Sequence, residues 1–181
     1  VDAPNQILVV GGLDRTGEML GSVELIDMEQ GSVSEVGQLG APRTGVAAVA
    51  CADGVLVIGG WELFGRDGEG TVLREPSDRV ELVRLSGGVA SIQDLSPLTS
   101  PRAELSATLL GDGQTVLVCG GVTEAQGLLV EASASCERVS CSSGAEENPL
   151  PQQMRSPRWT HRATLLPGGK VLISGGFNPG F

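Results

Sequence analysis

The only histidine of the chain, His161, stands in a compact polar and aromatic cluster with Trp159, Thr160 and Arg162. A histidine can act as the general base for a serine nucleophile, but no Gly-x-Ser-x-Gly phrase accompanies this one. A histidine without a second histidine nearby is also a poor metal site. The sequence therefore predicts no catalytic residue and no metal, and it leaves Trp159 and His161 as candidate ligand contacts.

A second group of candidate residues lies in the longest insertion of the chain, residues 61–78. Trp61, Phe64 and Arg66 stand close together there, and loops of this kind often carry function. Aromatic rings beside Arg66 and Glu69 could bind a carbohydrate or a peptide. The alternative is that the insertion packs between neighbouring repeat units and binds nothing.

Three arginines recur in a Leu/Met-x-x-Pro-Arg phrase: Arg43, Arg102 and Arg158. Equivalent positions in a repeat protein could line one face and attract an anion. Alternatively, each arginine pairs with a repeated carboxylate and ties strands together. The carboxylates considered for that role are Glu24, Glu81 and Glu137. The recurrence in successive units favours the structural role.

The element behind this recurrence is an apolar run that ends in two glycines, found four times at intervals of roughly 50 to 60 residues. The apolar run is too short for an ordinary helix and suits a strand that is buried on both faces. The glycines are expected to end the strand where backbones crowd or φ is positive. They are Gly11, Gly12, Gly59, Gly60, Gly120, Gly121, Gly175 and Gly176.

Each unit is predicted to contain four short strands. In order, these are an alanine-bearing strand after Pro-Arg, the apolar strand before the diglycine, a Val-Glu strand and a closing strand. Together the 27 glycines and 10 prolines of the 181 residues indicate an all-β protein. The units run approximately over residues 1–41, 42–100, 101–156 and 157–181 of one array. The first unit is expected to begin at its second strand, and the last to end just after its second.

Charge and cysteine content limit the functional classes. The net charge of −10, with scattered basic residues, argues against nucleic-acid binding. No apolar run approaches the length of a membrane span. Cys51 and Cys119 align with apolar or small residues in the other units and are expected to be core residues. Cys136 and Cys141 lie in a serine-rich stretch and are the candidate for a local disulfide, which would imply an oxidising compartment.

These residues resemble the Kelch repeat, whose pattern combines an arginine, an alanine-bearing strand, a VLVxGG-type strand and a Val-Glu strand. The resemblance covers nearly the whole chain, and it implies a β-propeller with one four-stranded blade per repeat. We expect about three and a half blades of an incomplete ring, which missing blades or a second chain would complete. The chain departs from the pattern because it has no tyrosine and lacks the tryptophan of the fourth strand.

The expected function is a non-catalytic interaction module that presents loops to a protein or a glycan, without a cofactor. One alternative is a propeller enzyme similar to sialic acid epimerases, because Arg and Glu suffice for proton transfer. Another is a purely structural segment of a larger surface protein. A copper oxidase similar to galactose oxidase is excluded by the absence of tyrosine. The resemblance and the cysteines favour an extracellular or cell-surface location in a bacterium.

Overall fold

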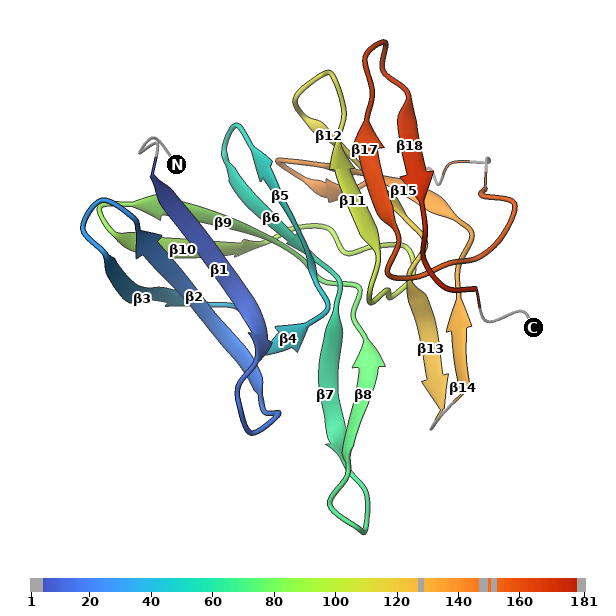
Figure 1. Cartoon of the computed structure of the whole chain (residues 1–181), viewed down its shortest axis with the longest axis horizontal. Helices are drawn as coiled ribbons and strands as arrows, with labels where there is room; N and C mark the ends of the chain where they lie inside the picture. Colours follow the sequence, from blue (N-terminus) through green and yellow to red (C-terminus); the bar gives the residue numbers. More distant parts are fainter. Residues whose placement is uncertain (1–4, 127–128, 147–149, 151–152, 179–181) are drawn as a thin grey trace.

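A computed structural model describes residues 5–126, 129–146, 150 and 153–178, and its regular structure consists of β-strands (Figure 1). The strands form several small antiparallel sheets, none of which closes on itself. The prediction of an all-β chain is therefore confirmed. The described part of the chain contains no helix with the length and hydrophobicity that a transmembrane segment requires.

The N-terminal sheet has three strands, in the order β1-β2-β3. They are β1 (Gln6–Leu13), β2 (Met19–Asp27) and β3 (Ser32–Gln38). The apolar strand before the first diglycine forms one edge of this sheet, as expected for a unit that begins at its second strand. Alternate residues of β1, Ile7 and Val9, are 45% and 41% exposed, so this strand is covered on one face only.

Two four-stranded sheets follow, and in each of them the strands lie side by side in their order along the chain. The first is β5-β6-β9-β10 and the second is β11-β12-β15-β16. The strands of the first are β5 (Ala47–Cys51), β6 (Gly54–Ile58), β9 (Val80–Ser86) and β10 (Val89–Asp94). Those of the second are β11 (Ser106–Leu109), β12 (Thr115–Cys119), β15 (Cys136–Ser140) and β16 (Gly144–Ala145).

Three further groups of strands complete the described chain. The C-terminal pair consists of β17 (Arg162–Leu165) and β18 (Val171–Ser174). Two hairpins follow the second and third diglycines and project to the same side of the molecule (Figure 1). The first consists of β7 (Trp61–Arg66) and β8 (Val72–Pro76), and the short strand β4 (Arg43–Thr44) pairs with the other edge of β7. The second consists of β13 (Val122–Gln126) and β14 (Leu129–Ala132). The insertion 61–78 is thus an ordered hairpin.

The core lies between successive sheets and explains the apolar runs. Leu56 and Ile58 of β6 belong to one buried cluster with Val116 and Val118 of β12. Val57, which points to the other face of β6, belongs to a second cluster with residues of the N-terminal sheet. Because side chains alternate along a strand, a run without polar residues is required where both faces are covered. This condition holds for β6 and β12, whereas the apolar strands at either end leave one face partly exposed.

The diglycines form the joints between successive units. The Gly60 N–H donates to the Arg102 carbonyl over 2.8 Å, and the Gly121 N–H donates to the Arg158 carbonyl over 2.9 Å. A Cβ at Gly59 would overlap the Arg102 carbonyl, and its φ of 60° lies in the left-handed region. For both reasons, any residue with a side chain would be costly at this position. All eight repeated glycines have positive φ, and three of the four pairs follow the end of a strand as predicted, whereas β1 continues through Gly11 and Gly12 with a register shift.

The repeated arginines are buried and paired in the two central sheets. Arg43 forms an ion pair with Glu81, and Arg102 pairs with Glu137 through Nε at 2.9 Å. These four side chains are no more than 2% exposed, which is the arrangement that the structural interpretation required. Burial lowers the pKa of Arg43 from its usual value to about 10, so that this arginine stays protonated at neutral pH. The third expected partner, Glu24, forms no ion pair among the described residues.

The cysteine pairing differs from the prediction. Cys119 is joined to Cys136, and Cys51 is joined to Cys141 across a separation of 90 residues. The expected local bridge between Cys136 and Cys141 is therefore wrong. Cys119 lies in the core and Cys51 packs against it, as expected, but both are disulfide-bonded. The reason is strand register: β15 runs antiparallel to β12 and places Cys136 directly opposite Cys119. Two disulfides favour an oxidising compartment.

Candidate functional site

A cleft of about 430 Å³ lies between the turn that joins β1 to β2 and the hairpin β7–β8. Its floor is largely apolar, and two carboxylates, Glu18 and Glu62, stand among its lining residues. The apolar lining residues are Met19, Ala41, Pro42, Leu63 and Val72. The cleft is thus assembled from two different repeat units and the linker between them.

Both turns beside the cleft are closed by an aspartate. In the hairpin, Asp67 Oδ1 accepts hydrogen bonds from the backbone N–H groups of Glu69 and Thr71. The bond from the Thr71 backbone is the main reason that the pKa of Asp67 is lowered. In the β1–β2 turn, Asp14 Oδ1 accepts from the Thr16 hydroxyl and from two backbone N–H groups. Such turns hold the cleft walls in defined conformations.

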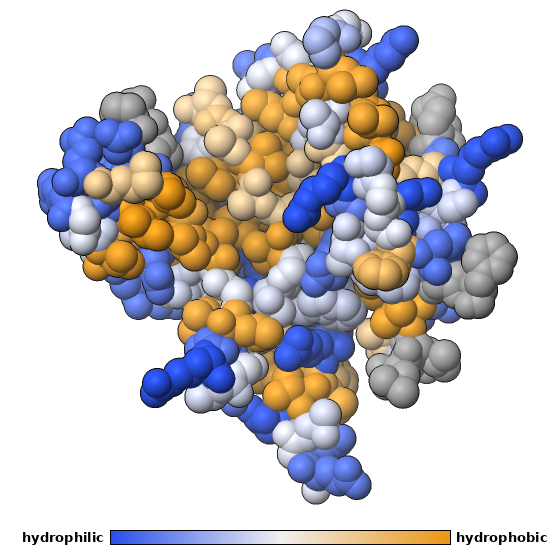
Figure 2. Space-filling model, in the orientation of Figure 1, coloured by the Kyte–Doolittle hydropathy of each residue, from blue (hydrophilic) through white to orange (hydrophobic). Residues whose placement is uncertain are grey.

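Two ion pairs neutralise the carboxylates of the cleft. Arg66, at the end of β7, forms an ion pair with Glu18 and also donates to the Gly70 carbonyl over 3.1 Å. Glu62 accepts a hydrogen bond from the Ser77 hydroxyl at 2.6 Å and lies 3.3 Å from Arg79 Nε. The charges of the walls are therefore matched within the protein. What the cleft offers to a ligand is mainly apolar surface flanked by polar groups. Figure 2 shows apolar and polar side chains side by side on the projecting hairpin β7–β8, which forms one wall of the cleft.

The structure places the predicted residues of the insertion on one hairpin, but it gives them different surroundings. Trp61 is half-buried and pairs with Thr44 of β4. Phe64 is 68% exposed at an irregular position of β7, between Leu63 and Gly65. Leu63 and not Phe64 is a lining residue of the cleft. Sequence reasoning singled out this segment as a loop, and it missed the hairpin, Leu63, Glu62 and the contribution of the β1–β2 turn.

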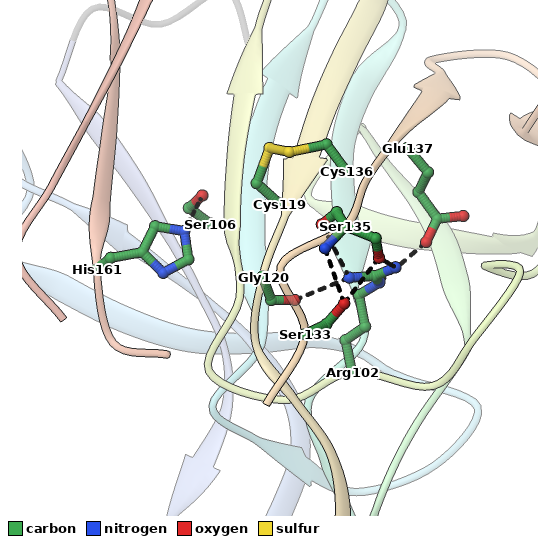
Figure 3. Close-up of a disulfide and its surroundings, with 9 residues drawn as sticks. All are labelled: Arg102, Ser106, Cys119, Gly120, Ser133, Ser135, Cys136, Glu137 and His161. Carbon is green, nitrogen blue, oxygen red and sulfur yellow. Dashed lines mark hydrogen bonds and ion pairs between the residues drawn. A yellow bond between two sulfur atoms is a disulfide. The ribbon is translucent and has the colours of Figure 1, made fainter. Parts of the chain in front are cut away.

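The second predicted group, Trp159 and His161, does not line this cleft. The Trp159 ring lies 5.9 Å from the ring of Phe177, with which it forms a β-bridge. His161 is 2% exposed, and its Nε2 lies 2.8 Å from the Ser106 hydroxyl (Figure 3). A side chain this buried is unavailable to a ligand, so the expected ligand contact at His161 gives way to a packing role. Val46 and Leu105 occupy the equivalent positions of the preceding units.

Burial of His161 predicts a loss of stability in mild acid. Burial, and secondarily the charge of Arg158, lower the pKa of His161 below 6.5. The unfolded chain then binds more protons than the folded chain at a pH between the two pKa values, so the free energy of unfolding falls as pH decreases below 6.5. We expect this pH dependence in urea denaturation at pH values just below 6.5, and we expect it to vanish in His161→Leu. An unchanged slope in His161→Leu would assign the effect to other groups.

The described residues contain no cluster of three or more His, Cys, Asp or Glu side chains that could hold a metal ion. The acidic residues of the cleft walls are instead engaged with arginines and a serine. The two carboxylates that line the cleft are therefore already engaged by other side chains of the protein.

Comparisons with known proteins give the fold and no activity. No family model matches this sequence, and no curated protein sequence matches it. Among the solved structures that match is one titled "Structure of YjhT", with a TM-score of 0.67 and 17% sequence identity. The alignment covers 91% of this chain and 48% of that chain. This chain thus spans about half the length of a protein that is similar to it in fold.

Proposed function

We propose that this chain is a Kelch-like β-propeller array that acts as a non-catalytic interaction module, with the cleft between β1–β2 and β7–β8 as its binding surface. The propeller interpretation is supported by two four-stranded antiparallel sheets with one strand order and by joints of identical chemistry between units.

The observation that carries the proposed binding role is the apolar floor of the cleft between two ordered turns. Apolar floors with a few polar groups at the edge are typical of binding sites. A peptide segment of a protein partner fits this chemistry better than a glycan, because Leu63, Met19 and Val72 offer no hydrogen bonds from their side chains. The net charge of −10 favours a partner with a basic surface through long-range attraction.

A secreted or cell-surface location accompanies this proposal. Disulfides persist in oxidising compartments and are rare in the cytosol. Both bridges in this chain connect strands or strand ends of the two central units. We place the module outside the cytoplasm for this reason.

The proposal is tested by selecting peptides from a displayed library on the wild-type chain and measuring their affinity for variants. Leu63→Ser removes apolar contact area from the cleft and should weaken the selected peptides about 10-fold or more. Leu73→Ser is the matched control, because Leu73 lies on the same hairpin and is not a lining residue of the cleft. It should leave the affinity unchanged.

Two results would contradict this assignment. One is equal affinity of the selected peptides for the wild type and Leu63→Ser. The other is that the chain binds glycans on an array and that this binding is lost on substitution of residues outside the cleft. The glycan result would revive the carbohydrate-binding alternative, which the same set of variants can locate on the surface.

A further inference from the structure

The residue two places after each repeated arginine has a left-handed backbone conformation. It is Gly45 in one unit, with a φ of 63°, Glu104 in the next, with 54°, and Thr160 in the last, with 52°. Glycine adopts this conformation freely, whereas a residue with a Cβ is strained in it. Glu104 is therefore held in a strained conformation at a position where the preceding unit has a glycine.

The three left-handed residues form a hydrogen-bonded row across neighbouring units. The Glu104 N–H donates to the Gly45 carbonyl over 3.0 Å, and the Thr160 N–H donates to the Glu104 carbonyl over 2.9 Å. Both units that flank Glu104 are thus part of the described chain, and both hold its backbone. The row defines where the Glu104 side chain lies.

The side chain of Glu104 lies over Gly45, beside the ring of Trp61. The place where a Cβ at Gly45 would stand is 2.5 Å from Glu104 Oε1 and 3.1 Å from Trp61 Cδ1. The backbone of Trp61 is fixed there by its pairing with Thr44 of β4, the residue before Gly45. A side chain at position 45 would displace the carboxylate. The glycine therefore makes room for an acid beside an indole ring.

The Glu104 carboxylate has no partner in the part of the chain that the structure describes. Glu104 is half-buried, and it takes part in none of the ion pairs of the described residues. Its side chain also accepts none of their hydrogen bonds, whereas the repeated carboxylates Glu81 and Glu137 are paired with arginines. Residues held in strained backbone conformations cluster at active sites and ligand-binding sites. An unpaired carboxylate on such a residue therefore points to a ligand.

The chemistry of this position selects a cation with a flat apolar face. An ionised carboxylate can only accept hydrogen bonds, so its ligand must donate them. The net charge of −10 attracts cations. A guanidinium group is a planar cation that pairs with both oxygens of a carboxylate at once and stacks on aromatic rings. Glu104 offers both oxygens and Trp61 offers the ring.

We infer that Glu104 and Trp61 form a binding site for a guanidinium group, carried by an arginine side chain of a partner protein or by free arginine. The carboxylate of Glu104 accepts two N–H bonds from the guanidinium, and the ring of Trp61 packs against its plane. This site is separate from the cleft between β1–β2 and β7–β8, because neither residue lines that cleft. It therefore does not depend on the function proposed for the cleft.

The inference is tested by NMR titration of the ¹⁵N-labelled chain with Nα-acetyl-arginine amide. The chain has two tryptophans, so its two indole N–H signals report on Trp61 and Trp159, and the variant Trp159→Phe assigns them. The control compound is Nα-acetyl-citrulline amide, which has nearly the same shape and no charge. We expect a saturable shift of the Trp61 signal with the arginine compound and none with the citrulline compound.

Titration with free arginine identifies the source of the guanidinium group. Tighter binding of the capped compound assigns the site to an arginine side chain within a polypeptide. Tighter binding of free arginine assigns it to a small molecule.

Three variants locate the binding. Glu104→Gln keeps the size of the side chain and removes its charge, and it should weaken binding about 10-fold or more. Glu69→Gln removes an exposed carboxylate at the tip of the hairpin that carries Trp61, and it should leave the affinity unchanged. Glu104→Gly should abolish binding and raise the urea midpoint, because glycine adopts the left-handed conformation without strain.

Three results would overturn the inference. The first is equal binding of the arginine and citrulline compounds, and the second is unchanged affinity in Glu104→Gln. The third is a lower urea midpoint in Glu104→Gly, because the carboxylate would then stabilise the folded chain itself. Glu104→Gln should not affect peptides selected for the cleft, so the two binding surfaces are tested independently.

Discussion

Replacing Arg102 with leucine is expected to lower the free energy of unfolding by about 3–5 kcal/mol, measured by urea denaturation. Arg102 is 1% exposed, and so is its partner Glu137. The substitution leaves a buried carboxylate without its cation and removes the donors to Gly120 and Ser135. A cost of this size is a large fraction of the stability of an ordinary domain.

Two control variants separate the ion pair from a general loss of positive charge. Arg155→Leu removes an exposed arginine and should change stability by no more than about 0.5 kcal/mol. The double variant Arg102→Leu/Glu137→Leu should be more stable than Arg102→Leu alone, because no unpaired charge remains buried. If Arg102→Leu has wild-type stability, the structural role assigned to the repeated arginines is wrong.

Removing the long-range disulfide is expected to have an effect of similar size. The bridge between Cys51 and Cys141 closes a loop with a sequence separation of 90, and the bridge between Cys119 and Cys136 closes one of 17. Chain-entropy estimates give losses of about 4–5 kcal/mol for the first and about 3 kcal/mol for the second. We expect Cys51→Ala/Cys141→Ala to be less stable than Cys119→Ala/Cys136→Ala in denaturant titrations.

Comparing the two double variants with each other controls for the effect of the cysteine-to-alanine substitutions on stability. Each double variant loses two sulfur atoms and gains two alanines within the central part of the fold, so the remaining difference reports mainly on the length of the loop. Equal stability, or the opposite order, would show that strain or residual structure in the unfolded chain outweighs loop length at these sites.

Local patterns predicted the strands well, because the strand signal is contained in consecutive residues. The apolar runs before the diglycines correspond to β1, β6, β12 and β18. The segment 136–138, which has the weakest Val-Glu pattern, is part of β15. These assignments depend on side-chain alternation and on glycine conformation, both of which are properties of short segments.

The disulfides show where local reasoning fails. Cys136 and Cys141 are close in sequence, which favoured a bridge between them. The register of β15 against β12 instead sets Cys136 opposite Cys119. Register between strands of different hairpins depends on the packing of both sheets, and no short segment of this sequence encodes it.

The sequence pointed to only one wall of the cleft, because the other wall comes from a different repeat unit. The hairpin of Trp61 and Phe64 attracted attention through its aromatic residues, but Met19 and Leu63 meet only when two units are folded side by side. His161 was predicted as a ligand contact, although the equivalent residues of the preceding units, Val46 and Leu105, are apolar. The structure instead buries His161 beside the Ser106 hydroxyl.

The most direct test of the proposed binding role is the hydrogen-exchange footprint of a selected peptide on the wild-type chain. Protection is expected in the β1–β2 turn, residues 14–19, and in the hairpin of residues 61–76, with Leu63→Ser abolishing it. Protection confined to residues 159–177, with no change in the hairpin, would contradict the assignment of the cleft as the binding surface.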